Sequence, residues 1–310
     1  MTELAEVFTQ YGDIYRQQYG KRLLHSHRQA MQAVVDCRTE QLGGCVYRCS
    51  QCDEIHYSYH SCQNRHCPKC QAQNGQTWLE KQTKLLLPTP YFLLTFTVPQ
   101  ELRRLIRTHQ KRLYNILFRT SAKATQQLAR DPRWVGGKIG MVGVLHTWGR
   151  NLVYHPHVHY LVPAGGLTEQ GGWQAASHNF LVPVKALSRI FRAQFRDALQ
   201  QTDWFDSIPA NVWRDEWVVH CKPVGNGTAA LKYLAPYIFR VALSNRRILR
   251  IANDKVAFRF RRSDTGQWRT CVLDVLEFIR RFLQHVLPKG FVKVRYYGLF
   301  SPGNRHLLVI

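Results

Sequence analysis

The chain has 310 residues, enough for about two domains, and 45% of them are hydrophobic, which excludes a disordered tail. Lys and Arg number 43 against 20 Asp and Glu, and the resulting net charge of +23 favours a nucleic-acid partner over an anionic membrane surface or plain solubility. No apolar run is long enough to cross a membrane and no signal peptide is visible, so we expect a cytoplasmic protein without membrane partners.

The first part of the chain predicts helices on both sides of a cysteine-rich segment. Residues 3–35 have apolar residues at helical spacing, and residues 74–88 predict a short helix that ends in the sequence LPTP. The segment 36–73 has little periodicity, so we expect it to fold around something other than a hydrophobic core. The prolines of LPTP mark the expected boundary between a domain of residues 1–88 and one of residues 89–310.

After this boundary the predicted strands and helices alternate. The expected strands 247–251 and 255–262 would form a hairpin, which implies antiparallel pairing and an α+β fold. The expected strands are 91–98, 139–148, 157–163, 216–224, 247–251, 255–262 and 291–298, and the expected helices are 100–130, 184–201, 227–242 and 272–287.

Seven of the nine cysteines lie between residues 37 and 70, and four of them form two Cys-x2-Cys pairs. Zinc takes four tetrahedral ligands, and two cysteines separated by two residues can both reach one ion. The pairs therefore predict a zinc-ribbon-like site of Cys49, Cys52, Cys67 and Cys70, with a structural role because all four positions are filled.

Further metal-ligating residues surround these pairs. Cys37, Cys45, Cys62 and His66 could build a second zinc site interleaved with the first. The alternative is that they are small buried residues and a solvated histidine.

The sequence YHPHVHYLVP, residues 154–163, puts three histidines on a predicted strand. Because strand side chains alternate, His157 and His159 share a face and could ligate one cation. A short turn near 151–152 would bring His146 opposite His157 as a third ligand. A polar strand face without metal is the alternative, and His155, next to Pro156, is expected to be a neighbour and not a ligand.

Tyr233 and Tyr237 are four residues apart, the spacing at which helix side chains share a face. Beside a histidine-bound metal on a basic protein, two phenols suggest attack on a phosphodiester with a covalent phosphotyrosine intermediate. They could equally be core residues of an amphipathic helix.

Three motifs, in this order along the chain, carry a family resemblance. LGGCVYRCSQC with YHSCQNRHCPKC resembles a transposase zinc-binding domain, HPHVHYLVPAGG resembles the HUH motif of rolling-circle nucleases, and YLAPYIFRVALSNRRI resembles the tyrosine helix of two-tyrosine HUH transposases. The chain is thus similar to the HUH transposases of bacterial insertion sequences from about residue 20 almost to its end. It departs at Cys45, where the family often has His.

The resemblance implies a fold and an activity. The fold would be an antiparallel sheet with flanking helices and a central HUH strand, preceded by a small helical, zinc-ribbon-like domain. His157 and His159 would hold Mg2+ or Mn2+, and Tyr233 and Tyr237 would be nucleophiles that nick and transfer single-stranded transposon ends through a 5′ phosphotyrosine. The zinc module and the basic surface would grip the DNA, and a homo-oligomer is compatible with this activity.

Pro236 lies between the two tyrosines, and proline is poorly accommodated inside a helix. If the helix starts or kinks there, the enzyme would work with one tyrosine, and Tyr237 would be favoured. Two other functions stay open: a plasmid replication initiator or relaxase with the same chemistry, and a zinc-ribbon DNA-binding regulator with none.

Overall fold

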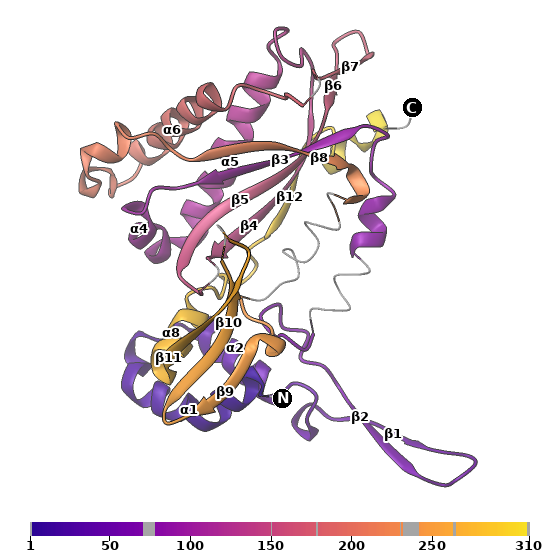
Figure 1. The fold of residues 1–310 in the computed structure, drawn as a ribbon, viewed down its shortest axis with the longest axis vertical. Coiled ribbons are helices and arrows are strands. Elements are labelled where there is room, and N and C mark those ends of the chain that lie inside the picture. Colours follow the sequence, from indigo (N-terminus) through magenta and orange to yellow (C-terminus); the bar gives the residue numbers. More distant parts are fainter. Residues whose placement is uncertain are drawn as a thin grey trace. The chain divides into compact units, whose positions relative to one another are not determined.

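The computed structural model describes residues 2–70, 78–149, 151–177, 179–229, 231, 242–262 and 265–308 (Figure 1). These residues form two compact units, each assembled from three separate stretches of chain. The first, which we call the cysteine unit, takes residues from 1–77, 148–154 and 239–289, and the second, the sheet unit, from 78–147, 155–238 and 290–310. These units are discontinuous in sequence, whereas the domains expected from the sequence are the consecutive blocks 1–88 and 89–310.

The helices and strands follow the predicted alternation. The named helices are α1 (Leu4–Tyr19), α2 (His25–Asp36), α4 (Leu102–Thr108), α5 (Gln110–Ala129), α6 (Val184–Gln200) and α8 (Val275–Leu283). The strands are β1 (Gly44–Arg48), β2 (Ile55–Tyr59), β3 (Pro90–Thr97), β4 (Gly140–Trp148), β5 (Tyr154–Pro163), β6 (Gly165–Leu167), β7 (Trp173–Ala175), β8 (Val219–Asn226), β9 (Ile248–Ala252), β10 (Lys255–Arg261), β11 (Trp268–Asp274) and β12 (Val294–Gly298).

The sheet unit is built on a five-stranded sheet in the order β12-β4-β5-β3-β8. Strand β5, which carries the histidines, is the central strand, and β3 pairs with it antiparallel so that Thr95 lies opposite His159 and Thr97 opposite His157. Strand β8 pairs antiparallel with the other edge of β3, and β12 pairs antiparallel with β4. The α+β fold with flanking helices and a central histidine strand is thus confirmed.

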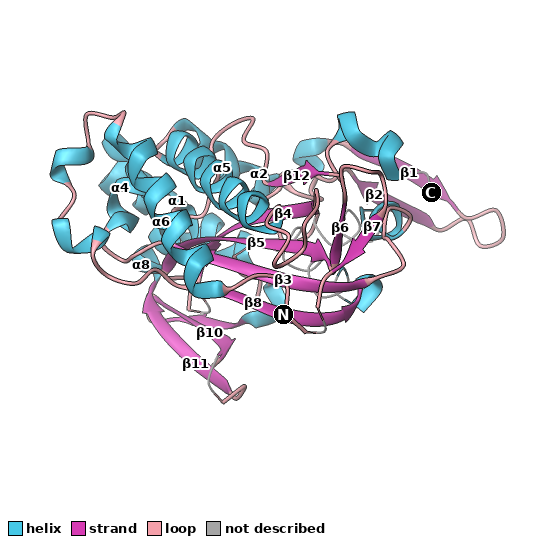
Figure 2. Cartoon of the chain, turned by 90° about the horizontal axis from the view of Figure 1, so that it is seen from above, coloured by secondary structure: helices cyan, strands magenta, loops and turns pink. Residues whose placement is uncertain are grey.

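Helices α5 and α6 cover one face of this sheet (Figure 2). Phe96 of β3 and Tyr160 of β5 point to that face, where Phe96 packs edge-on against Phe191 of α6 with ring centroids 5.0 Å apart. The buried Tyr160 hydroxyl donates to the Phe118 carbonyl of α5 at 3.0 Å and lies 2.8 Å from the Ser121 hydroxyl. Since side chains alternate along a strand, His157 and His159 belong to the opposite face.

The cysteine unit has a core of its own, in which helices pack against the small sheet β11-β10-β9. Phe282 of α8 meets Phe8 of α1 with ring centroids 5.6 Å apart, and Phe278 meets Phe258 of β10 at 5.7 Å. Helix α8 begins where the Asp274 side chain accepts a hydrogen bond from the backbone N–H of Leu276 at 2.9 Å, an N-cap that satisfies one of the free donors of the first turn.

The turn between β4 and β5 also belongs to the cysteine unit. Leu152 is fully buried in the core of that unit, and its φ of 63° is left-handed, a conformation that costs a non-glycine residue about 1–2 kcal/mol. Its carbonyl accepts hydrogen bonds from Gln284 Nε2 at 2.8 Å and from His285 Nε2 at 3.1 Å. The hairpin that carries the histidines in the sheet unit therefore has its turn fixed in the cysteine unit.

Three local predictions differ from the structure. Residues 44–59 of the cysteine-rich segment form the hairpin β1–β2, although they bury no apolar face. The expected helix 100–130 is divided into α4 and α5 at His109, whose φ of −118° is not helical. The last helix begins at Val275 and not at Val272, because residues 268–274 pair with β10 as strand β11. No helix among the described residues is long and apolar enough to cross a membrane.

Candidate active site and metal centres

Three histidines from two adjacent strands meet on the face of the sheet that α5 and α6 leave uncovered. One ring nitrogen from each of His146, His157 and His159 lies within 4.8 Å of the others. The ring centroids of His157 and His159 are 4.9 Å apart, and His146 lies 5.2 Å and 4.6 Å from them. The structure thus brings together the two histidines of the strand motif and the predicted third ligand, and we call them the histidine cluster.

Hydrogen bonds orient two of these imidazoles. The Nδ1 atom of His157 lies 2.6 Å from the backbone carbonyl of His155. Because a carbonyl only accepts, Nδ1 of His157 must carry the proton, and its Nε2 keeps a lone pair for a metal. The Nδ1 atom of His159 lies 2.9 Å from the Thr95 hydroxyl. Each strand histidine is therefore held through Nδ1, as is usual for metal-ligating imidazoles.

Burial keeps the two strand histidines, His157 and His159, neutral. Burial, with a contribution from His159, lowers the pKa of His157 to about 3, and burial together with the charge of Lys222 lowers the pKa of His159 to about 4. A neutral imidazole is the form that ligates a metal. The donor set fits a first-row divalent ion, and Mn2+ better than Mg2+, which takes oxygen ligands.

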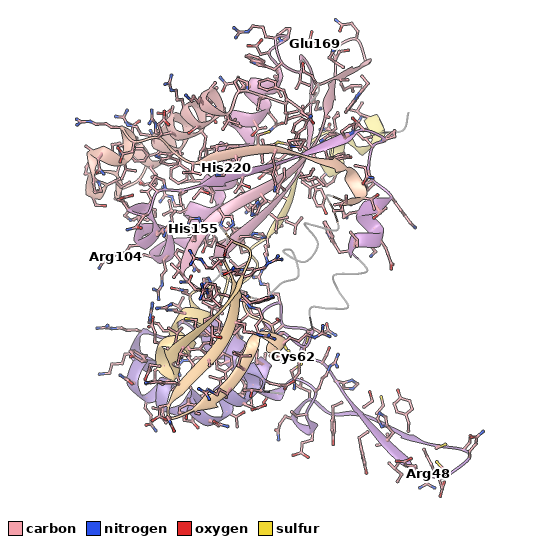
Figure 3. All side chains as sticks on the ribbon, in the orientation of Figure 1. Arg48, Cys62, Arg104, His155, Glu169 and His220 are labelled. Atoms are coloured by element: carbon pink, nitrogen blue, oxygen red, sulfur yellow. The ribbon has the colours of Figure 1, made fainter. Side chains whose placement is uncertain are left out.

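His155, expected from the sequence to be a neighbour and not a ligand, lies close to the cluster. Its ring lies 5.2 Å from that of His157, but it does not belong to the group of nitrogens that could share an ion. Burial and the charge of Arg103 lower its pKa to about 4. On the other side of β3, His220 of β8 lies opposite Thr95, on the same face as His159 (Figure 3).

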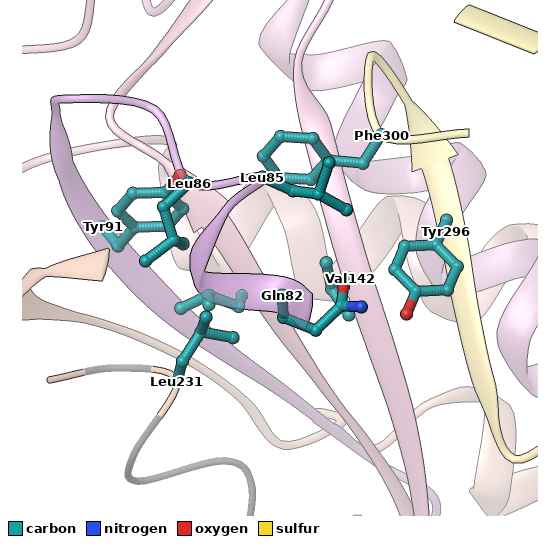
Figure 4. Close-up of a pocket in the computed structure, with 9 residues that line it drawn as sticks. Gln82, Leu85, Leu86, Tyr91, Val142, Leu231, Tyr296 and Phe300 are labelled. Carbon is teal, nitrogen blue, oxygen red and sulfur yellow. The ribbon is translucent and has the colours of Figure 1, made fainter. Parts of the chain in front are cut away.

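The two predicted nucleophiles, Tyr233 and Tyr237, lie outside the described residues. Leu231, two positions before Tyr233, is described and is 1% exposed. It lines a small apolar pocket on the histidine side of the sheet, together with Tyr91, Val142 and Leu161 (Figure 4). Leu231 therefore lies on the sheet face that bears the histidine cluster.

A second group of metal ligands lies in the cysteine unit. One Sγ atom from each of Cys37, Cys62, Cys67 and Cys70 lies within 4.8 Å of the others. The Cys70 sulfur is 3.4 Å from that of Cys37 and 3.5 Å from that of Cys62. Zinc–sulfur bonds of about 2.3 Å place tetrahedral ligands about 3.8 Å apart, so the four thiols fit a structural zinc site.

This grouping differs from the one expected from spacing. Cys67 and Cys70 lie with Cys37 and Cys62, and not with Cys49 and Cys52, which are exposed at the tip of the β1–β2 hairpin. Figure 3 shows Arg48, next to Cys49, at the outer end of that hairpin and far from Cys62.

The other expected second-site residues also lie elsewhere. Cys45 is exposed on β1, and His66 Nε2 accepts a hydrogen bond from the Leu287 N–H at 3.3 Å. At the hairpin tip, the backbone N–H groups of Cys52 and Gln51 lower the pKa of the Cys49 thiol. This favours a thiolate at Cys49, but no third described ligand joins it and Cys52.

Three residues around the histidine cluster carry no signal in the sequence. Thr95 contacts His159, Arg103 of α4 is close enough to act on His155 and His157, and Lys222 of β8 acts on His159. Thr95 and Lys222 are identified only by the register of β3 with its two neighbours, which alternation within a single strand does not reveal.

Comparisons with known families cover both parts of the chain. The family described as "Putative transposase" matches residues 140–306, and the IS91-type "Transposase zinc-binding domain" matches residues 7–98. The first match includes the histidine cluster, and the second includes the four-cysteine group.

Two curated relatives are similar over most of their length. The "Putative transposase y4qJ" of Sinorhizobium fredii (strain NBRC 101917 / NGR234) is 39% identical over 327 residues, which span 98% of this chain and 81% of the relative. The "Transposase for insertion sequence element IS801" of Pseudomonas savastanoi pv. phaseolicola is 30% identical over 287 residues, spanning 86% of this chain and 68% of the relative. No solved structure matches the chain significantly.

Proposed function

Because the chain belongs to the insertion-sequence transposases of the IS91 type, we propose that it nicks and transfers single-stranded element ends through a 5′ phosphotyrosine intermediate. The observation that carries this proposal is the histidine cluster on the sheet face opposite α5 and α6. Three imidazoles whose ring nitrogens lie within 4.8 Å of one another support a divalent ion at this site, which such a reaction needs.

The proposed cleavage exchanges one phosphoester for another. A tyrosine hydroxyl loses its proton and its oxygen attacks the phosphorus, while the bond from phosphorus to the 3′ oxygen breaks and that oxygen takes up a proton. The products are a 5′ phosphotyrosine and a free 3′ hydroxyl, which conserves the energy of the broken bond. Strand transfer is the reverse step with a different 3′ hydroxyl.

His146, His157 and His159 would hold the divalent ion, Mn2+ or Mg2+. Such an ion, when bound, polarises the scissile phosphate and offsets the charge that develops on it. His155 and Thr95 contribute by holding His157 and His159 through Nδ1, which leaves the opposite nitrogen of His157 available to the metal.

In this proposal the cysteine unit and the basic side chains that give the net charge of +23 bind the DNA. The zinc-binding family match and the four-cysteine group support a structural zinc ion in that unit. Burial raises the pKa of the Cys37 thiol to about 11, so zinc must displace protons from the buried thiols as it binds.

The test uses the purified full chain with Mn2+ and a 5′- or 3′-labelled single strand that carries the end of its element. We expect a DNA–protein adduct that resists SDS, and its loss when Tyr233 and Tyr237 are both changed to Phe. Tyr47→Phe, at an exposed tyrosine of β1, is the matched control and should leave the adduct unchanged. Single variants then assign the nucleophile: loss in Tyr237→Phe alone establishes one tyrosine.

The proposal is overturned if the wild-type chain gives no adduct with any divalent ion or strand polarity. It is also overturned if an adduct persists in the double tyrosine variant. Binding without an adduct would instead indicate a DNA-binding regulator.

A further inference from the structure

Arg103 lies on α4, which follows β3 directly, and is partly buried. Its Nε is buried and has no hydrogen-bond partner among the described residues. Its charge reaches both His155 and His157, so the guanidinium lies beside the first part of the histidine strand. A buried guanidinium N–H without an acceptor is costly, and an acceptor other than the described residues, such as a bound phosphate, would remove this cost.

Lys222 of β8 lies level with the other end of the histidine strand. It is exposed on β8 and pairs with Leu93 of β3, which in turn pairs with Leu161 of β5. Residues opposite each other in a ladder share a face, so Lys222 is on the face of the histidine cluster, and its charge reaches His159.

The two cations therefore stand on either side of the histidine cluster along β5. From His155 to His159 the strand rises about 13 Å at about 3.3 Å per residue, which is longer than a single phosphate group. An acceptor that meets both cations and the cluster between them must be an extended polyanion and not a single small anion.

We propose that Arg103 and Lys222 bind the DNA phosphates that flank the scissile one, so that the single strand lies along β5. This inference rests on the proposed function. The planar guanidinium donates two parallel hydrogen bonds to phosphate oxygens, and the ammonium acts as a point charge on the exposed side. Both are positioning residues: they place the scissile phosphate over the histidine cluster.

The experiment compares Arg103→Gln and Lys222→Gln with Arg104→Gln. Arg104 is exposed on the same helix, and Figure 3 shows it on α4 with His155 on β5. Binding of a fluorescent single-stranded oligonucleotide is measured by anisotropy over a salt series in EDTA, so that metal plays no part. We expect Arg103→Gln and Lys222→Gln each to weaken binding about tenfold and to reduce the salt slope by about 1. We expect Arg104→Gln to cause neither the tenfold loss of affinity nor the reduction of the salt slope.

Adduct formation and Mn2+ binding complete the test. We expect the adduct rate to fall with Arg103→Gln while Mn2+ affinity is retained, because the cations contact DNA and not the metal. Arg103→Lys keeps the charge and should recover part of the binding, and it replaces Arg103→Gln if that variant does not fold.

The inference is overturned if Arg103→Gln and Lys222→Gln bind DNA as tightly as Arg104→Gln does. The proposed function still stands in that case, provided that the wild-type chain forms the adduct. If the wild-type chain forms no adduct, the proposed function fails, and the binding series in EDTA still decides whether these cations contact DNA.

Discussion

At the scale of single residues, the hydroxyl of Thr95 matters because it holds His159 through Nδ1 at 2.9 Å. Thr95→Val keeps the shape of the side chain and removes this contact. We expect Mn2+ affinity to fall about 10- to 100-fold, the usual cost of losing a partner that orients a metal-ligating histidine. Isothermal titration with Mn2+ measures the change.

Thr97→Val is the matched control for Thr95. Thr97 lies opposite His157 in the same pair of strands, but His157 is held by the carbonyl of His155. Its replacement should leave Mn2+ affinity within about twofold of the wild type. Equal losses in both variants would show that Thr95 acts through strand packing and not through its hydroxyl.

The lowered pKa values of the histidines set the response to pH. With values of about 3 for His157 and about 4 for His159, both imidazoles stay neutral well below the usual pKa of about 6.5. Since the folded values lie below the unfolded one, these groups stabilise the fold above pH 6.5, and this contribution is lost as the pH falls toward 4 and 3.

We therefore expect Mn2+ affinity to change little between pH 7 and pH 5. Ordinary imidazoles would lose affinity on the order of thirtyfold per histidine over this range, because protons would compete for the ring nitrogens. Titrations at pH 7, 6 and 5 distinguish the two cases, and a loss of that size would contradict the buried, neutral state of the cluster.

At the scale of elements, the hairpin β1–β2 separates two cysteine pairs that the sequence places in one site. Cys67 and Cys37 are buried in the core of the cysteine unit, whereas Cys49 and Cys52 are exposed at the hairpin tip. We expect Cys67→Ser to remove one zinc ion per chain and to lower the melting temperature, because zinc binding and folding of such a unit are coupled.

Cys49→Ser is the paired variant for this prediction. It should leave the zinc ion of the four-cysteine group in place and the melting temperature nearly unchanged. Elemental analysis of both variants gives the number of zinc ions per chain. If both variants lose the same ion, the ligands are Cys49, Cys52, Cys67 and Cys70, as their spacing predicts, and the structural grouping is wrong.

Elements with a strong internal pattern could be predicted from the sequence. The expected strand 157–163 and the expected helix 184–201 correspond to β5 and α6, whereas the central position of β5 was implied only by the family resemblance. The hairpin β1–β2 was missed although Ile55, Tyr57 and Tyr59 alternate along β2, and the apolar face that they form is exposed. The start of α8 was misplaced because Val272 fits the helical spacing, although it belongs to β11.

At the scale of the whole molecule, contacts between distant segments limit what the sequence reveals. Cys37 and Cys62 join Cys67 and Cys70 because α2 and the following hairpin return the chain to one place, whereas spacing favours a site of two Cys-x2-Cys pairs. Arg103 and Lys222 reach the histidines through the order β5-β3-β8, which is a property of the sheet. Among many basic residues, neither differs in sequence from a surface cation.

The burial of Leu152 in the core of the cysteine unit has a consequence for how such proteins can evolve. The family matches divide the chain into consecutive stretches, but the cysteine unit also needs the turn at 148–154 and the segment containing α8. A recombination event near residue 88 would therefore combine Phe8 with a foreign Phe282 and a foreign turn. Viable chimaeras should inherit all three stretches from one parent, so the N-terminal part is not an exchangeable cassette.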